Sequence, residues 1–376
     1  MNKSIKILCF LLGLPVLLQA QAKSKATVVI TNPSKSARLN AVVAISWQDV
    51  VSKYPNIDTA NFKVVNPLNR QEIPFQLEYR GQKAVQNLLV QLNLKSGASE
   101  IEIVAGKPAP VTPKTYGRFV PERYDDFAWE NDKVAYRMYG KALEGRKDNA
   151  FGTDVWVKKT SKLIINEWYK KNDYHHDNGD GMDYYSVGLT LGAGDIAPLV
   201  KDSVIFSLNY HHWKVLDNGP LRTTFQLGYD EWKVAGKAVK VTKTISLDAG
   251  SHLNRVEAEY TYAGDGDLPI VVGIVKRAEP GTILMDEQQG IAGYWEAQHG
   301  EDGTTGVATI VPSASRMSID KVHLLSHGKV KAGQAFVYYN GSAWTKGKEI
   351  TNAKEWFNYL NNFKQQLQQP LTVSVK

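Results

Sequence analysis

The chain has 376 residues, 43% hydrophobic and 22% charged, which is the composition of a folded globular protein and excludes wholesale disorder. Its formal net charge of +7 is spread along the sequence without a run of like charges, so a nucleic-acid-binding arm is not expected. The single cysteine excludes a disulfide framework, a cysteine zinc site and an iron–sulfur cluster. The length suits one large β domain and a small one.

The N-terminal segment has the pattern of an export signal. Two lysines precede an apolar run over 7–18, and Ala20-Gln21-Ala22 matches a cleavage site. We therefore expect residues 1–22 to be a signal peptide that directs the protein to the periplasm or the extracellular space. Cys9 lies inside the apolar run rather than at a lipoprotein cleavage point, so a soluble exported protein is expected. No later segment has the roughly 20 apolar residues of a membrane helix.

Residues 23–108 are predicted to form a small N-terminal β-sandwich. Runs rich in β-forming residues begin at Ala26, Asn87 and Ile101, and turn-forming residues bound them. A proline-rich connector follows over 106–113. Because prolines and glycines punctuate structure, we expect a domain boundary there.

Residues 109–376 are predicted to form a large antiparallel β-sandwich. Over 221–262, apolar and polar residues alternate along three runs separated by turns, so one face of each strand should be buried. One helix is predicted over 353–368, because Asn352 can cap its start and apolar residues form a single stripe along it. A last strand is expected at 371–375. The predicted fold is thus dominated by β-structure, with one C-terminal helix.

The segment 122–140 crowds carboxylates around aromatic residues. Trp129, Glu130 and Asn131 are candidate substrate-binding residues, since a ring can take the apolar face of a sugar while polar groups bind its hydroxyls. Arg137 is a candidate catalytic residue that would neutralise a substrate carboxylate. The alternative is a structural corner in which Trp129 is buried and the acids pair with nearby basic residues.

The segment 172–188 concentrates histidine, aspartate and tyrosine in a glycine-containing loop. The candidate proton-transfer residues are His175, His176, Tyr184 and Tyr185. A neutral histidine, or a tyrosine activated by a nearby cation, can act as a base near neutral pH. The alternative is a solvated, hydrogen-bonded loop.

The same loop carries candidate metal ligands. These are Asp177, Asp180 and Asp183, which could bind a divalent cation such as calcium. Their spacing does not fit the calcium-binding EF-hand loop. The sequence requires no cofactor, so the cation is a possibility rather than a necessity.

Further candidate substrate-binding residues are scattered along the large region. They are Arg222, His211, His212, Trp295 and His299. An arginine can hold the carboxylate of an acidic sugar through two parallel hydrogen bonds. The two adjacent histidines precede a β run, and neighbours in a strand point to opposite faces, so only one of them should join any given site.

The stretch Trp129–Gly140 and the loop from Tyr174 to Tyr185 resemble a secreted bacterial family described as domain of unknown function 4861. The resemblance covers most of the mature chain, and members of that family look to be encoded near polysaccharide-degrading enzymes. The meander over 243–258 is similar to the galactose-mutarotase type of large sandwich, which occurs in sugar epimerases and several polysaccharide lyases. The histidine and glutamate pair of mutarotases has no counterpart here, which argues against that activity.

These features together favour an exported carbohydrate-active protein that acts on uronic-acid-containing glycans. The leading hypothesis is β-elimination by a lyase, with histidine and tyrosine moving protons and Arg137 or Arg222 holding the carboxylate. One alternative is a glycoside hydrolase using paired carboxylates of the segment 125–132. The other is a glycan-binding protein without chemistry. An acidic glycan is the expected partner, and neither a nucleic acid nor a membrane span is expected.

Overall fold

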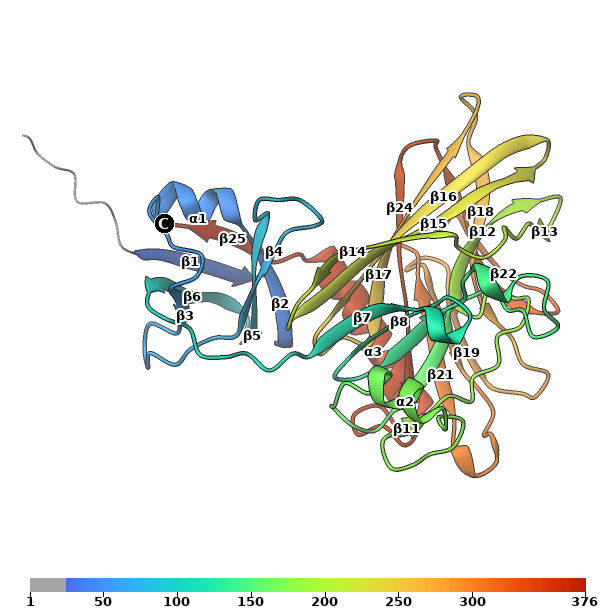
Figure 1. Cartoon of the computed structure of the whole chain (residues 1–376), viewed down its shortest axis with the longest axis horizontal. Coiled ribbons are helices and arrows are strands. Elements are labelled where there is room, and N and C mark those ends of the chain that lie inside the picture. Colours follow the sequence, from blue (N-terminus) through green and yellow to red (C-terminus); the bar gives the residue numbers. More distant parts are fainter. Residues whose placement is uncertain (1–24) are drawn as a thin grey trace, which may run out of the picture.

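The computed structural model describes residues 25–376, so the predicted signal peptide at 1–22, with Cys9, lies outside the described residues. Two β-rich bodies lie side by side, the smaller one built mainly from the N-terminal part of the chain (Figure 1). Within residues 25–376, no helix is long and apolar enough to cross a membrane. The predicted β-dominated fold with a C-terminal helix is confirmed.

The smaller body is a sandwich of two antiparallel sheets. One sheet has the order β25–β1–β6–β3 and contains β1 (Lys25–Asn32), β3 (Phe62–Val65), β6 (Gly97–Ala105) and β25 (Thr372–Val375). The other has the order β2–β5–β4 and contains β2 (Arg38–Ser46), β4 (Phe75–Glu78) and β5 (Asn87–Leu94). Helix α1 (Trp47–Lys53) follows β2. Alternate residues of both sheets, such as Ile30 and Val90, are fully buried between them, as the β pattern requires.

The end of the chain returns to this smaller body. Strand β25 pairs with β1 from Val28 opposite Val375 to Thr31 opposite Thr372. Figure 1 shows the red C-terminal segment crossing back to the smaller sandwich. The strand itself was predicted, but the sequence placed it in the region 109–376, and this pairing corrects that placement. The partner of a strand depends on long-range closure of the chain, which local pattern does not encode.

The larger body contains an eight-stranded antiparallel sheet. Its order is β14–β15–β16–β17–β24–β21–β20–β19. Its strands are β14 (His212–Asn218), β15 (Arg222–Val234), β16 (Lys237–Asp248), β17 (Leu253–Tyr262), β19 (Thr282–Asp286), β20 (Ile291–Trp295), β21 (Thr305–Ile310) and β24 (Ala335–Trp344). The predicted meander corresponds to β15, β16 and β17, which pair in consecutive hairpins.

Two five-stranded sheets lie against the inner face of the eight-stranded sheet. One has the order β11–β10–β9–β8–β7, with β7 (Thr115–Val120), β8 (Asp126–Asn131), β9 (Ala135–Met138), β10 (Asp154–Lys158) and β11 (Gly181–Met182). The other has the order β13–β12–β18–β23–β22, with β12 (Ala193–Val200), β13 (Ser203–Val204), β18 (Leu268–Val275), β22 (Arg316–Ile319) and β23 (His323–Val330). A single apolar core joins all three sheets.

Two helices cover outer faces of the larger body. Helix α2 (Ile165–Lys171) packs on the sheet that contains β8 and β10. Helix α3 (Ala353–Gln368) has the predicted bounds, and the side chain of Asn352 caps it by accepting a hydrogen bond from the amide of Glu355. Its buried residues Trp356 and Leu360 pack on β20 and β21. The short 3₁₀ turns are η1 (Pro121–Arg123), η2 (Lys141–Leu143) and η3 (Gly300–Asp302).

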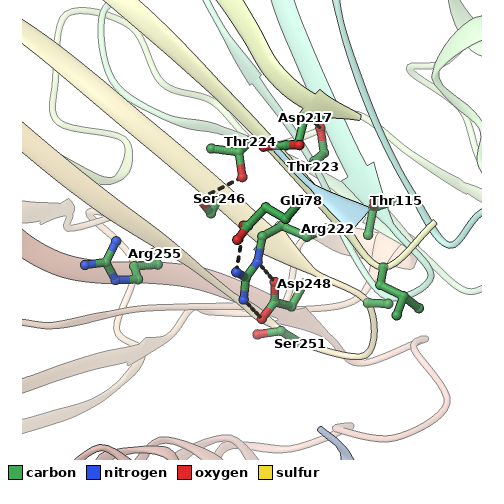
Figure 2. A network of polar contacts seen from close by, with 12 residues as sticks. Glu78, Thr115, Asp217, Arg222, Thr223, Thr224, Ser246, Asp248, Ser251 and Arg255 are labelled. Atoms are coloured by element: carbon green, nitrogen blue, oxygen red, sulfur yellow. Dashed lines mark hydrogen bonds and ion pairs between the residues drawn. The ribbon is translucent and has the colours of Figure 1, made fainter. Parts of the chain in front are cut away.

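Arg222 joins the two bodies rather than facing a substrate. Its guanidinium donates to Glu78 of the smaller body at 3.0 Å and, through two nitrogens, to Asp248 of the larger one at 2.5 and 2.9 Å. Figure 2 shows Arg222 held between these two carboxylates. The prediction that Arg222 binds an acidic sugar is thereby corrected, because protein carboxylates already occupy its bidentate edge.

Removal of this cation should destabilise the fold. We expect Arg222→Ala to lower the free energy of unfolding by about 2–3 kcal/mol, because Glu78 would stay buried without its partner. Urea unfolding followed by circular dichroism measures this loss. The control is Arg70→Ala, which removes an arginine from an exposed pair with Glu102 and should cost less than about 1 kcal/mol. Equal losses for both variants would contradict the buried-clamp interpretation.

Candidate functional site

The alternation of side chains along β8, β9 and β10 builds the floor of a cleft. Phe127, Trp129 and Tyr136 point inward to the main core. Asp126, Arg137 and Asp154 therefore point to the opposite, outer face, because successive residues of a strand alternate. Arg137 and Asp154 are direct partners in the pairing of β9 with β10. The strand register thus fixes their contact.

Arg137 is surrounded by three carboxylates. One of its terminal nitrogens lies 2.6 Å from Asp154 and 3.1 Å from Asp183, and the other lies 3.6 Å from Asp126. All four side chains are at most 8% exposed. Asp183 directly follows β11, the strand next to β10 in this sheet. Three neighbouring strands and the residue after the fourth therefore supply one charge cluster. A single positive charge cannot balance three negative charges in such a buried setting.

Burial shifts the acidity of two of these carboxyl groups. Desolvation raises the pKa of Asp126 to about 7, with Arg137 opposing the shift. Desolvation, reinforced by the nearby Asp154, raises the pKa of Asp183 to about 8. Tyr169 donates a hydrogen bond to Asp126 at 3.1 Å, and Tyr139 donates one to Asp154 at 3.0 Å. Near neutral pH the cluster therefore holds at least one protonated carboxylic acid.

The cluster forms part of a cleft of about 460 Å³. Among the predicted catalytic residues, Arg137, His175, Tyr184 and Tyr185 all line it, as does the predicted metal ligand Asp183. Residues from two segments far apart in sequence therefore meet here. Their convergence makes this cleft the candidate active site.

His175 is oriented by the backbone of the loop. Its Nδ1 lies 3.1 Å from the carbonyl oxygen of Asp183, so Nδ1 carries the proton and donates. The other ring nitrogen is then an acceptor, on a side chain that is 57% exposed. His176, the next residue, is exposed and does not line the cleft, so the prediction for His176 is corrected. Loop geometry separates the two, since neighbouring side chains diverge.

The two tyrosines are not prepared to act as bases. Burial raises the pKa of both Tyr184 and Tyr185 above the usual value for tyrosine. The Tyr184 hydroxyl lies 2.5 Å from that of Thr305, and its ring stacks on His299. The ring of Tyr185 lies under the guanidinium of Arg277. Both phenols remain protonated at neutral pH and can serve as hydrogen-bond donors or packing groups.

Trp129, Glu130 and Asn131 support the scaffold instead of binding substrate. The indole of Trp129 is 1% exposed and donates to Asn254 at 2.8 Å in the core. Glu130 pairs with the buried Lys158 at 2.7 Å and accepts the first amides of α2. Asn131 links two turns: its Oδ1 accepts from two amides of the β8–β9 turn, and its Nδ2 donates to two carbonyls at the β16–β17 turn. The substrate-binding prediction for these three is corrected, and the structural-corner alternative describes them.

The three predicted metal ligands have separate partners. Asp177 accepts from the amides of Gly179 and Gly181 and pairs with Lys159 at 2.6 Å, while Asp180 lies 3.8 Å from Lys162. Asp183 faces Arg137. Among residues 25–376 no group of three or more histidine, cysteine or acidic side chains is arranged to hold a metal ion. The structure thus does not bring these aspartates together into the predicted calcium site.

The remaining predicted binding residues lie outside the cleft lining. His211 lies 2.9 Å from Glu144 and 2.7 Å from Asp230. His212 also lies 2.9 Å from Asp230. The two adjacent histidines therefore contact the same carboxylate, whereas the sequence predicted that only one of them would join any given site. Trp295 is buried under α3, which corrects its predicted role. His299 is exposed and touches the cleft indirectly, through its stack on Tyr184.

Sequence reasoning missed several residues of the charge cluster and of the cleft. Asp154 opens a short apolar strand, and a charged residue at the start of a buried run was the available signal. Arg123 and Lys147 line the rim, and neither has an ion-pair partner among the residues that the structure describes. Tyr124 and Asp125 adopt positive φ angles of 51° and 61°, which turn the chain from η1 into β8. Nothing in local pattern marks that turn.

The molecule is therefore a β-sandwich protein with a cleft built on an arginine and three carboxylates. The chain belongs to the family described as domain of unknown function (DUF4861), whose model matches residues 30–373. A protein of Formosa agariphila named Uncharacterized protein P7 is 34% identical over 296 residues, which is 73% of each chain. The predicted family membership is confirmed.

Two solved structures from Enterococcus faecalis share the fold. One is described as a protein in the glycosyl hydrolase family 38, with a TM-score of 0.53 and 9% identity, over 94% of this chain and 48% of that one. The other is described as an alpha-mannosidase, with a TM-score of 0.50 and 9% identity, over 94% of this chain and 46% of that one. The present chain spans about half the length of these two chains.

The raised pKa values predict a specific pH dependence of stability. Because the folded protein binds protons to Asp126 and Asp183 that the unfolded chain has lost, stability should fall as pH rises from about 4 through 7 and 8. Asp183→Asn removes one of these two proton-binding groups. The free energy of unfolding of this variant minus that of wild type should therefore rise by about 1 kcal/mol or more from pH 5 to pH 9.

Urea unfolding at both pH values measures this difference. Asp265→Asn, at an exposed aspartate of a loop, is the matched control and should show the same offset at both pH values. A pH-independent offset for Asp183→Asn would mean that this carboxyl is ionised throughout the range.

Proposed function

We propose that the protein is an exported enzyme that cleaves glycosidic bonds of uronic-acid-containing glycans, with Asp183 and Asp126 as its acid–base pair. The observation that carries the proposal is the cluster itself: two carboxyl groups with unequal, raised pKa values line one cleft beside a shared arginine. Pairs of titratable groups whose environments separate their pKa values are typical of acid–base catalysis.

These two groups would supply the general acid and the general base of a hydrolysis reaction. Asp183, with the higher pKa, would donate its proton to the leaving oxygen as the bond from that oxygen to the anomeric carbon breaks. Asp126, held by Tyr169 and Arg137, would take a proton from the water whose oxygen bonds to that carbon. Arg137 would stabilise the carboxylate left on Asp183. This pairing differs from the predicted hydrolase pair, because only Asp126 comes from the segment 125–132.

The rim of the cleft supports an acidic substrate. Arg123 and Lys147 line it and carry positive charge above an acidic floor. A glycan with a carboxylate could pair with them while its glycosidic oxygen faces Asp183. The descriptions of the two structures with the same fold name glycoside-cleaving enzymes, which is consistent with this class of substrate. The export signal predicted at 1–22 stays part of this proposal.

β-Elimination is the second candidate, and His175 favours it. Its free ring nitrogen could remove the proton next to the uronate carboxylate, while Asp183 protonates the same leaving oxygen as in hydrolysis. Arg123 or Lys147, rather than the saturated Arg137, would then neutralise the carboxylate. The two candidates therefore share the acid and differ in the base.

The test is an assay of mature protein on a panel of uronic-acid polysaccharides and oligosaccharides. Hydrolysis releases reducing ends without new ultraviolet absorbance, whereas elimination adds the absorbance of a conjugated unsaturated uronate. Asp183→Asn and Asp126→Asn should each lower kcat/KM by about 100-fold or more, because each removes one proton-transfer group. Cleavage that survives both substitutions would overturn the assignment.

His175→Ala distinguishes the two reactions. It should abolish elimination and leave hydrolysis within a few-fold of wild type, and the adjacent exposed His176→Ala is the matched control that should change neither. If no panel member is cleaved but one binds, the protein is a glycan-binding protein and the enzymatic proposal fails.

A further inference from the structure

Trp213 is the only exposed one of the nine tryptophans, all of which lie within residues 25–376. It is 44% exposed, and it belongs to β14, an edge strand of the eight-stranded sheet. In the pairing of β14 with β15, Trp213 lies opposite Leu227, which is fully buried in the core. Because directly opposed residues of a strand pair point to the same face, the indole points inward, but it reaches water at the open edge of the sandwich.

A second aromatic ring supports the indole from one side. The ring of Phe119 in β7 stacks on it, with ring centroids 4.9 Å apart and planes inclined by 15°. Strand β7 is an edge strand of the neighbouring five-stranded sheet, so the two rings close the gap between two sheet edges. With one face covered by Phe119 and 44% of the residue exposed, the opposite face of the Trp213 ring is open to solvent.

The surroundings of Trp213 suit a sugar better than a protein. Trp213 is the only exposed large apolar side chain of β7, β14 and β15. Its neighbours along β14, His212 and Lys214, are exposed and polar. A protein interface needs a contiguous patch of many residues, whereas a sugar can stack its C–H face on a single aromatic ring and direct its hydroxyls to polar neighbours and water. A glycan is therefore the ligand that fits this surface.

A short segment of chain connects Trp213 to the rim of the cleft. The hydroxyl of Tyr210 donates to the carbonyl of Asp125, the residue after Tyr124, which is exposed and lines the cleft. Trp213 follows Tyr210 by three positions, so their Cα atoms are at most about 11 Å apart. The indole and the rim are thus neighbouring parts of the molecule, within reach of a glycan chain that extends out of the cleft.

We propose that Trp213 is a stacking platform for a distal sugar of a glycan chain whose cleavage point lies in the cleft. The chain leaves the cleft past Tyr124, and one of its later sugar rings lies on the open face of the indole. The substrate is then a polysaccharide or a long oligosaccharide rather than a disaccharide, because a short chain cannot contact both places. The inference rests on the proposed function, since it takes the cleft to hold another part of the same glycan.

Native electrophoresis through gels that contain polygalacturonate, alginate or hyaluronate measures this binding without turnover. At least one of these polymers should retard the mature protein. Trp213→Leu keeps an apolar cover over Phe119 but removes the flat face, so it should bind the polymer about fivefold more weakly. Trp213→Tyr keeps a flat ring and should bind within about twofold of wild type. Ile283→Ala, at an exposed residue of β19 on the opposite edge of the same sheet, is the matched control and should bind like wild type.

Circular dichroism checks that each variant is folded. Equal retardation of Trp213→Leu and wild type would overturn the proposal, as would the absence of retardation of wild type in all three gels. A loss in Trp213→Tyr as large as that in Trp213→Leu would also overturn it, because the effect would then come from the packing of the sandwich edge and not from a flat platform.

Kinetic measurements separate this inference from the proposed function. Trp213→Leu should raise KM for the polymer about fivefold, and it should leave kcat and the kcat/KM of the shortest cleaved oligosaccharide unchanged. An equal rise in KM for the polymer and for that oligosaccharide would overturn the platform. Asp183→Asn should lose cleavage and keep its retardation. Retardation that depends on Trp213, in a protein that cleaves no polymer, would refute the enzymatic proposal alone and support the platform.

Discussion

The candidate site depends on one buried cation shared by three carboxylates. Arg137 contacts Asp126, Asp154 and Asp183 at the outer face of a sheet, under nearly complete burial. Because one guanidinium cannot neutralise three negative charges in a low-dielectric setting, at least one carboxyl group retains its proton near neutral pH. A protonated carboxylic acid in the cleft is therefore a consequence of charge balance.

A tightly packed aromatic support holds this cluster in place. The ring of Trp156, two residues after Asp154, stacks against Trp168 of α2 and against Tyr174, which begins the loop carrying Asp183. The buried Glu130–Lys158 pair fixes the start of α2 on the same sheet. These residues position the cluster without touching the cleft, so their substitution would affect the site through its geometry.

Neighbouring residues of β8 and β9 contact different parts of the molecule because successive side chains of a strand point to opposite faces of the sheet. The sequence grouped Trp129, Glu130 and Asn131 with Arg137 as one sugar-binding segment. In the structure Trp129 faces the core, Glu130 supports α2, and only Arg137 reaches the cleft. Composition drew attention to this segment, but which of its side chains face the cleft depends on which face of the sheet is covered.

By itself, the sequence determined the β-dominated fold and the bounds of α3, and it predicted the two segments that meet at the candidate site. Periodicity and helix capping depend on residues close together in sequence, so they predict strands and helices without knowledge of the tertiary structure. The residue types of the loop 172–188 likewise indicated proton-transfer chemistry, although not which residues face the cleft. Only the tertiary structure decided that β25 joins β1, that Arg222 joins two bodies, and that Asp126 and Asp183 meet at Arg137. Those contacts depend on long-range strand order and burial, which determine both the partners of a charge and its pKa.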